Sequence, residues 1–203
     1  VEQPDKAQIV ANGADRLVTE AFLSLYSTLR ITDDSRNSKL IAVTSTLPGE
    51  GKSFIASNLA LTFASQGHRT ILVDCDFRKP NVEQSFRLRV NKGVVNFCAN
   101  AATIDEIITK NVHPNLDVIT VGNRAKNPIQ MLNSREFEVL LGELRKRYDR
   151  VLLDTPPLGA VSDALNILPL MDGAIYTIRF SGAKRGAVQR CVQRLRSANI
   201  PIF

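Results

Sequence analysis

The sequence predicts an α/β fold, a doubly wound and mostly parallel sheet with helices on both faces. Apolar, β-branched runs alternate with helical patterns along nearly the whole chain. The runs are continuous and do not alternate between apolar and polar residues, which is typical of parallel strands covered on both faces. With 203 residues the chain is long enough for one domain with a real core.

The elements can be placed by their periodicity. Strands are expected at residues 39–45, 70–76, 116–121, 150–155 and 173–180, with helices between them at 53–66, 104–110, 134–147, 162–170 and 184–197. An amphipathic helix around residues 19–29 makes 1–38 an N-terminal helical extension to the main domain, 39–203. The first residue is not Met, which suggests a fragment. The last residues, "IPIF", resemble the start of another strand, so we expect a domain clipped at its C-terminal edge.

The composition is that of a globular protein, with 44% hydrophobic and 23% charged residues. No apolar run approaches the ~18 residues of a membrane-spanning helix. Three scattered cysteines favour a reducing cytoplasm over a disulfide or zinc framework. The net charge is +6, and four arginines lie along the last predicted helix, at 185, 190, 194 and 196. No aromatic residues interleave with them, so a solvated face is favoured over a nucleic-acid stripe.

The stretch "TSTLPGEGKS", residues 44–53, has the composition of a phosphate-binding loop between a strand and a helix. Its glycines let the backbone curl around an anion, and the following helix N-terminus adds aligned N–H groups. In the pattern GxxxxGK[ST], Lys52 would reach the β- and γ-phosphates and Ser53 would ligate Mg²⁺. Thr46 replaces the usual first glycine. The expected nucleotide contacts are Pro48, Gly49, Glu50, Gly51, Lys52, Ser53 and Phe54.

Two further segments add acidic residues at strand ends. In "ILVDCDFRKP", Asp74 and Asp76 are two apart, so both side chains are expected to face the ligand crevice while Cys75 faces the core. Such carboxylates suit a metal ion or a base for an incoming hydroxyl. In "RVLLDTPP", Asp154 ends an apolar strand, which is the usual position of a carboxylate that holds Mg²⁺ in a phosphate-binding site. Three such features on one sheet predict a phosphate-handling site.

These residues resemble the bacterial tyrosine kinases of capsule and exopolysaccharide assembly, the BY-kinases. The three segments look like their Walker A, Walker A′ and Walker B motifs, and "KNPIQML" and "DGAIYTIR" are also similar. The resemblance implies a P-loop kinase that transfers the γ-phosphoryl group of Mg·ATP to tyrosines, often its own. Lys52 would stabilise the transferring group. Asp74 and Asp76 would share metal binding and activation of the hydroxyl, and Ser53 and Asp154 would help hold Mg²⁺.

The resemblance also implies partners and a location. It predicts a membrane chain-length protein, or an upstream transmembrane region of the same polypeptide, as partner. It further predicts tyrosine-containing protein substrates and work at the inner face of the bacterial plasma membrane. Two departures bear on assembly and substrate. Leu23 and Tyr26 replace the arginines of the ExxRxxR motif used in ring contacts, and no tyrosine cluster ends the chain. Tyr26 is the one plausible internal acceptor, because Tyr148 and Tyr176 are expected to be packed.

Two alternatives remain open. A partition-type switch ATPase would carry a signature lysine where Leu47 stands, which argues against that class. A nucleotide-binding scaffold with weak or no kinase activity is favoured by the missing helix arginines. It is also favoured by Phe54, which replaces a second hydroxyl residue after the loop lysine. The retained Lys52, Ser53 and acidic residues speak against it.

Overall fold

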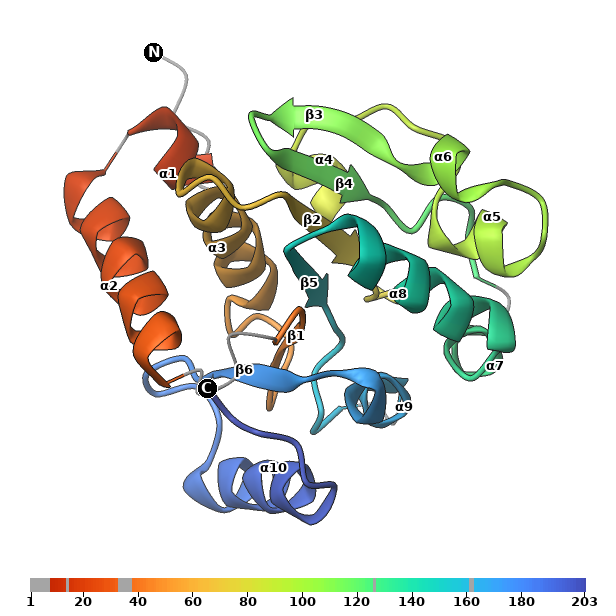
Figure 1. The fold of residues 1–203 in the computed structure, drawn as a ribbon. Coiled ribbons are helices and arrows are strands. Elements are labelled where there is room, and N and C mark those ends of the chain that lie inside the picture. Colours follow the sequence, from red (N-terminus) through yellow and green to blue (C-terminus); the bar gives the residue numbers. More distant parts are fainter. Residues whose placement is uncertain (1–7, 14, 33–37, 126, 161–162) are drawn as a thin grey trace.

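The computed structural model describes residues 8–13, 15–32, 38–125, 127–160 and 163–203. Its centre is a six-stranded sheet in the order β3-β4-β2-β5-β1-β6 (Figure 1). The strands are β1 Leu40–Ser45, β2 Thr70–Asp74, β3 Thr109–His113, β4 Leu116–Ile119, β5 Arg150–Asp154 and β6 Gly173–Thr177. All neighbouring strands are parallel except β3 and β4, which are antiparallel. The predicted α/β fold is confirmed.

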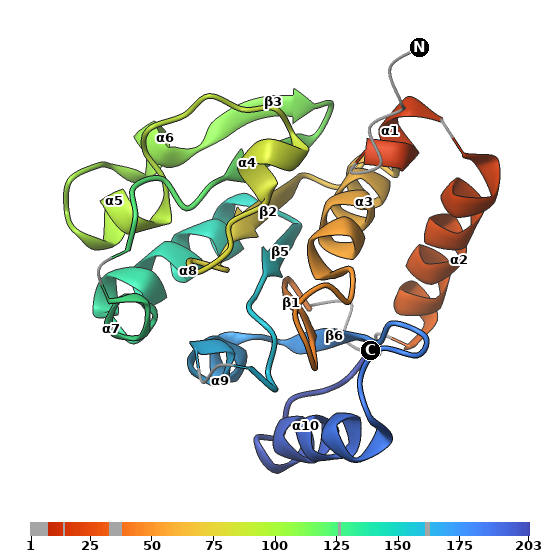
Figure 2. The same ribbon diagram turned by 180° about the vertical axis from the view of Figure 1, so that it is seen from behind.

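Helices cover both faces of the sheet, as Figures 1 and 2 show from opposite sides. One face packs against α1 Ile9–Asn12, α2 Arg16–Thr32, α3 Lys52–Ser65 and α4 Val82–Ser85. The other packs against α5 Val94–Cys98, α8 Arg135–Arg147, α9 Asp163–Ile167, the 3-10 turn η2 Leu168–Leu170 and α10 Arg185–Ser197. The short helices α6 Ile104–Ile107 and α7 Pro128–Leu132 complete the described elements. None of these helices has the length and apolarity needed to cross a membrane.

The edge strand β3 was not predicted from the sequence. The expected helix at 104–110 ends at Ile107, and the chain then turns into β3, which pairs with β4 across a tight turn at Asn115 (φ 63°). An edge strand with exposed side chains needs no apolar run, so its polar sequence "TKNVH" gave no strand pattern. At the opposite edge, Ile202 forms one parallel bridge with Ala174 of β6, as "IPIF" suggested.

Helix α2 packs its inner face onto α3. Phe22, Tyr26 and Leu29 follow helical spacing and are buried in the same cluster as the inner face of α3. The Tyr26 ring meets Phe63 edge-on with the centroids 5.4 Å apart, and its hydroxyl lies 3.1 Å from His68 Nε2. The expectation that Tyr26 is an accessible acceptor is therefore wrong, because the helix phase turns its side chain inward. Tyr148 is buried and Tyr176 half-buried, as expected.

Candidate active site

Three adjacent strands bring the sequence motifs to one edge of the sheet. β5 lies between β1 and β2, and Asp154 is in register with Val43 on one side and Asp74 on the other. Parallel strands end at the same edge, where α/β folds bind their ligands. The loop after β1, the turn after β2 and the turn after β5 therefore surround one position.

The loop after β1 has the conformation of a phosphate cradle. Gly49 and Gly51 have φ angles of 81° and 90°, a region that side-chain-bearing residues avoid. α3 begins directly behind them at Lys52, so its free N–H groups face the loop. The Glu50 side chain turns back and accepts a hydrogen bond from the Leu47 N–H at 2.7 Å. Any contact of Glu50 with a phosphate would therefore come from its backbone.

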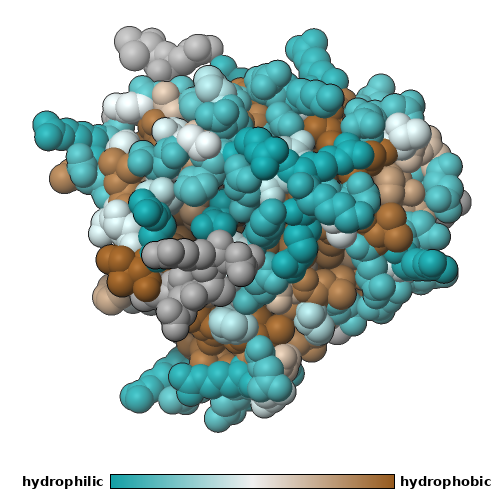
Figure 3. Space-filling view, viewed as in Figure 1, coloured by the Kyte–Doolittle hydropathy of each residue, from teal (hydrophilic) through white to brown (hydrophobic). Residues whose placement is uncertain are grey.

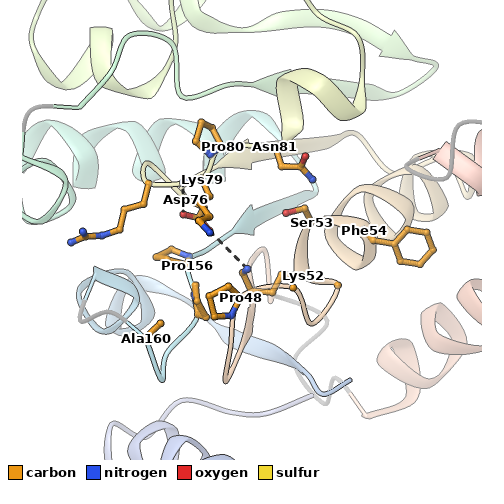
Figure 4. Close-up of a pocket in the computed structure, with 14 residues that line it drawn as sticks. Pro48, Lys52, Ser53, Phe54, Asp76, Lys79, Pro80, Asn81, Pro156 and Ala160 are labelled. Carbon is orange, nitrogen blue, oxygen red and sulfur yellow. Dashed lines mark hydrogen bonds and ion pairs between the residues drawn. The ribbon is translucent and has the colours of Figure 1, made fainter. Parts of the chain in front are cut away.

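A cavity of about 500 Å³ opens above this loop (Figure 4). Its walls come from the loop and the start of α3, from the turn after β2, and from the turn after β5. The lining residues are Pro48, Gly49, Gly51, Lys52, Ser53, Phe54, Asp76, Arg78, Lys79, Pro80, Asn81, Pro156, Pro157 and Ala160. The contributions of Pro80, Asn81 and Ala160 were not predicted, because they depend on how the two turns fold over the crevice.

Lys52 and Asp76 face each other across the cavity. Lys52 Nζ lies 3.8 Å from Asp76 Oδ2, and both side chains are more than nine-tenths buried (Figure 4). Asp76 Oδ1 also accepts a hydrogen bond from the Lys79 N–H at 3.1 Å, which fixes the carboxylate within its turn. The site thus offers a fixed cation and a fixed carboxylate to one ligand.

Asp74 does not face the cavity, so the expectation that both carboxylates point into it is wrong for this residue. Strand β2 ends at Asp74, and the turn folds back over it. The carboxylate accepts backbone N–H groups of Asp76, Asn81 and Val82 at 3.0–3.1 Å and is fully buried. Burial and the charge of Asp154 raise the pKa of Asp74. Cys75 is buried in the core, as predicted.

Asp154 is a fully buried carboxylate with unused bonding capacity. Within the described part of the chain, neither of its oxygens has a hydrogen-bond partner. Burial raises the pKa of Asp154, while the Lys52 charge and the nearby Ser53 hydroxyl lower it, although Ser53 makes no hydrogen bond of normal geometry to the carboxylate. A buried acceptor without a partner is costly, and a cation would relieve that cost. Asp154 and the Ser53 hydroxyl therefore fit the binding of a hard metal ion.

Phe54 lines the cavity at its edge but turns its ring away from Lys52 and Ser53 (Figure 4). The ring packs on Phe22 of α2, with the centroids 5.8 Å apart. The residue therefore offers a backbone N–H to a ligand and gives its side chain to the α2–α3 contact. Phe54 itself carries no hydroxyl, in contrast to a Ser or Thr at this position.

The fold and the site define a P-loop domain with a Walker A′ turn, and comparison with known proteins agrees. Residues 38–193 match the family described as an AAA domain. Tyrosine-protein kinase YwqD of Bacillus subtilis is 34% identical over 162 residues, which are 80% of this chain and 68% of YwqD. The kinase domain of the Escherichia coli tyrosine kinase ETK superposes with a TM-score of 0.87 at 28% identity, covering 96% of this chain and 76% of that domain. The chain belongs to the bacterial tyrosine kinase family.

Two further comparisons concern the coverage of a longer relative and a more distant protein of the same fold. EpsB of Ralstonia solanacearum is 31% identical over 183 residues, but these are 90% of this chain and only 24% of EpsB. The chain thus spans about a quarter of the length of this relative. The septum site-determining protein MinD of Pyrococcus horikoshii shares the fold, with a TM-score of 0.69 at 20% identity, covering 81% of this chain and 67% of that one.

Proposed function

We propose that this chain is the catalytic domain of an ATP-dependent protein tyrosine kinase, of the autophosphorylating type, that regulates exopolysaccharide or capsule synthesis and export. The observation that carries the proposal is the meeting of Lys52, Asp76 and the phosphate cradle in one cavity. Family membership and the names of relatives such as YwqD support it. The proposed site consists of the loop residues 48–54 with Asp74, Asp76 and Asp154.

Each residue has a role that follows from its place. The N–H groups of the loop and of the first turn of α3 would bind the β-phosphate, and Lys52 would neutralise charge on the transferring γ-phosphoryl group. Asp76 faces the same cavity and would accept the proton of the tyrosine hydroxyl. Asp74 would act indirectly, since its three backbone hydrogen bonds hold the turn that carries Asp76.

A Mg²⁺ ion, held by Ser53 and Asp154 together with phosphate oxygens, would supply charge neutralisation during transfer. The unpartnered carboxylate of Asp154 is the feature of this chain that supports such an ion. Among the described residues there is no group of three or more His, Cys, Asp and Glu side chains that would hold a metal alone. The nucleotide would therefore provide part of the coordination.

The proposed partners follow from the family. They are tyrosine-containing protein substrates and a membrane chain-length protein, or an upstream transmembrane region of the same polypeptide. The proposed place is the cytoplasmic face of the bacterial plasma membrane, and assembly into a homo-oligomer is part of the proposal. Leu23 and Tyr26 replace the ring-contact arginines, and Tyr26 is buried within its own subunit. A homo-oligomer would therefore use other contacts at this helix.

A scaffold with weak kinase activity is the second candidate, favoured by Phe54, which leaves a phosphate-side hydroxyl missing. Transfer from labelled Mg·ATP to a tyrosine-rich peptide separates the two. We expect labelled tyrosine, reduced by about 10³-fold in Lys52→Met, and unchanged in Lys146→Met, which alters an exposed lysine of α8. Free phosphate without labelled tyrosine would indicate a switch ATPase. Nucleotide binding with neither product would support the scaffold.

A further inference from the structure

The net positive charge of this chain comes entirely from its C-terminal segment. The whole chain has 26 Lys and Arg against 20 Asp and Glu, and residues 173–203 hold six of the basic residues and none of the acidic ones. Residues 1–172 are therefore neutral overall. Four of the six basic residues lie on α10, which forms a hydrophilic ridge at the bottom of the molecule in Figure 3, below hydrophobic surface. Such a segment favours an anionic partner.

A second hollow, of about 820 Å³, lies between α10 and the turn after β5. We call it the α10 groove. Its apolar surface comes from Leu158, Ala160, Leu165 and Ala198, and its polar surface from Arg190, Gln193, Arg194 and Ser197, with Gly159 at the turn. No described residue that lines it is acidic. The groove is thus an apolar trough with a positive rim.

The α10 groove adjoins the nucleotide cavity, because Ala160 lines both. The turn that separates them is fixed to the phosphate loop. The Leu158 N–H donates to the Ser45 carbonyl at 2.8 Å, and the Gly159 N–H donates to the Thr46 carbonyl at 3.0 Å. One side of this turn therefore faces the nucleotide and the other faces α10. A bound peptide that entered the cavity past Ala160 could therefore extend into the groove.

The two arginines of the rim stand one helical turn apart on α10. Arg190 and Arg194 are both solvent-exposed, and Arg194 Nη1 lies 3.4 Å from the Leu158 carbonyl, beside the shared turn. Guanidinium groups bind carboxylates through paired N–H donors. Arg190 and Arg194 therefore offer two guanidinium groups along one wall of the groove to acidic side chains of a bound segment.

We propose that the α10 groove binds the residues that flank the acceptor tyrosine, and that Arg190 and Arg194 select segments with acidic side chains there. The inference rests on the proposed kinase function, since the tyrosine would enter the nucleotide cavity past Ala160. The concave shape of the groove, and the residue that it shares with the nucleotide cavity, favour a peptide segment over a flat lipid surface. They also favour it over duplex nucleic acid, whose width does not fit a trough leading into an active site.

Peptide binding tests the groove without any catalysis. Two fluorescent peptides of equal length would carry one tyrosine flanked by three Glu or by three Gln, and binding would be measured by anisotropy with Mg·ADP present. We expect the wild type to bind the Glu peptide about fivefold more tightly, since exposed charge pairs contribute modestly. Arg190→Glu should abolish this preference. Arg196→Glu, the same charge change on α10 outside the groove, should retain it.

Arg194→Gln guards against misfolding as the cause of a loss. It removes one charge, and we expect it to reduce the preference about twofold with unchanged affinity for Mg·ATP. Equal binding of both peptides to the wild type would overturn the proposal. So would equal losses in Arg190→Glu and Arg196→Glu, which would mean that net charge alone acts. Binding to phosphatidylserine vesicles or duplex DNA that depends on Arg190, without any peptide preference, would also overturn it and assign the face to that ligand.

Phosphoryl transfer to the same two peptides keeps the two proposals separate. A preference in binding without labelled tyrosine would refute the kinase function and leave the groove intact as a peptide site. Labelled tyrosine with the same KM for both peptides would support the kinase and refute the groove. With both proposals correct, the Glu peptide should show the lower KM, and added salt should reduce the difference.

Discussion

Replacing Asp154 by Asn should make the protein more stable while it damages the site. The Asp154 carboxylate is fully buried, and neither oxygen has a hydrogen-bond partner in the described part of the structure. Its register partner on β2 is another buried carboxylate, Asp74, so a neutral amide also removes a repulsion. An unpartnered buried polar group costs about 1–3 kcal/mol, and a charged one costs more. We expect Asn to raise the free energy of unfolding by about 2 kcal/mol.

For a chain of this length such a gain corresponds to a rise in Tm of roughly 5 °C. The assay is thermal unfolding followed by circular dichroism, in EDTA and without nucleotide. Adding Mg·ATP should stabilise the wild type strongly and the variant weakly, because Asp154 is the proposed metal ligand. Asp117→Asn is the matched control. Its carboxylate accepts bonds from the Tyr148 hydroxyl and the Asn111 N–H, so the same change should lower stability there. An Asp154→Asn protein less stable than the wild type in EDTA would refute the reasoning.

Three further predictions concern close packing, the turn after β2 and a buried histidine. Gly159→Ala should destabilise the fold by about 2 kcal/mol in urea unfolding, because a Cβ there would lie 2.5 Å from the Thr46 carbonyl oxygen. In contrast, a Cβ at Gly142 in α8 meets open space, so Gly142→Ala should stabilise the fold by about 1 kcal/mol. Equal effects would contradict this. Asp74→Asn should lower the free energy of unfolding by about 2 kcal/mol and abolish phosphoryl transfer, because it weakens the hydrogen bonds that hold the turn of Asp76. Full kinase activity of this variant would exclude the positioning role of Asp74. Burial lowers the pKa of His68 in the folded state. The neutral imidazole therefore contributes to stability above the pKa of the unfolded state, and this contribution is lost as the pH falls through the pKa of the folded state. The free energy of unfolding of the wild type, measured relative to His68→Gln, should therefore fall between pH 7 and pH 5, because the titration of Asp74 and Asp154 is common to both proteins.

The core of the site could be predicted because each part of it is local in sequence. A loop with glycines before a helix, and an acidic residue after an apolar strand, are patterns whose geometry is fixed by neighbouring residues. Parallel strands then bring these patterns to one edge, as the register of Val43, Asp154 and Asp74 confirms. A cavity lies where these patterns meet.

The roles of Asp74 and Asp76 were beyond such reasoning. The two-residue spacing places both side chains on one face only while the strand continues, and β2 ends at Asp74. Beyond that point the turn decides where each side chain lies. The position of Tyr26 was readable in principle, since Phe22, Tyr26 and Leu29 follow one helical stripe. The α10 groove was not, because it forms between segments about 30 residues apart.

The packing of α2 on α3 ties the N-terminal extension to the rest of the molecule. α3 starts at the phosphate cradle, and its flank carries Phe22, Tyr26 and Leu29 of α2 in one shared cluster. A chain shortened to begin at Leu40 would leave that flank of α3 in water and would lose the support of Phe54 by Phe22. The shortest fragment that keeps the site intact must therefore begin before Arg16. Helix α2 is thus part of the same packed unit as the phosphate cradle, and a protease cut after it should leave an aggregation-prone remainder.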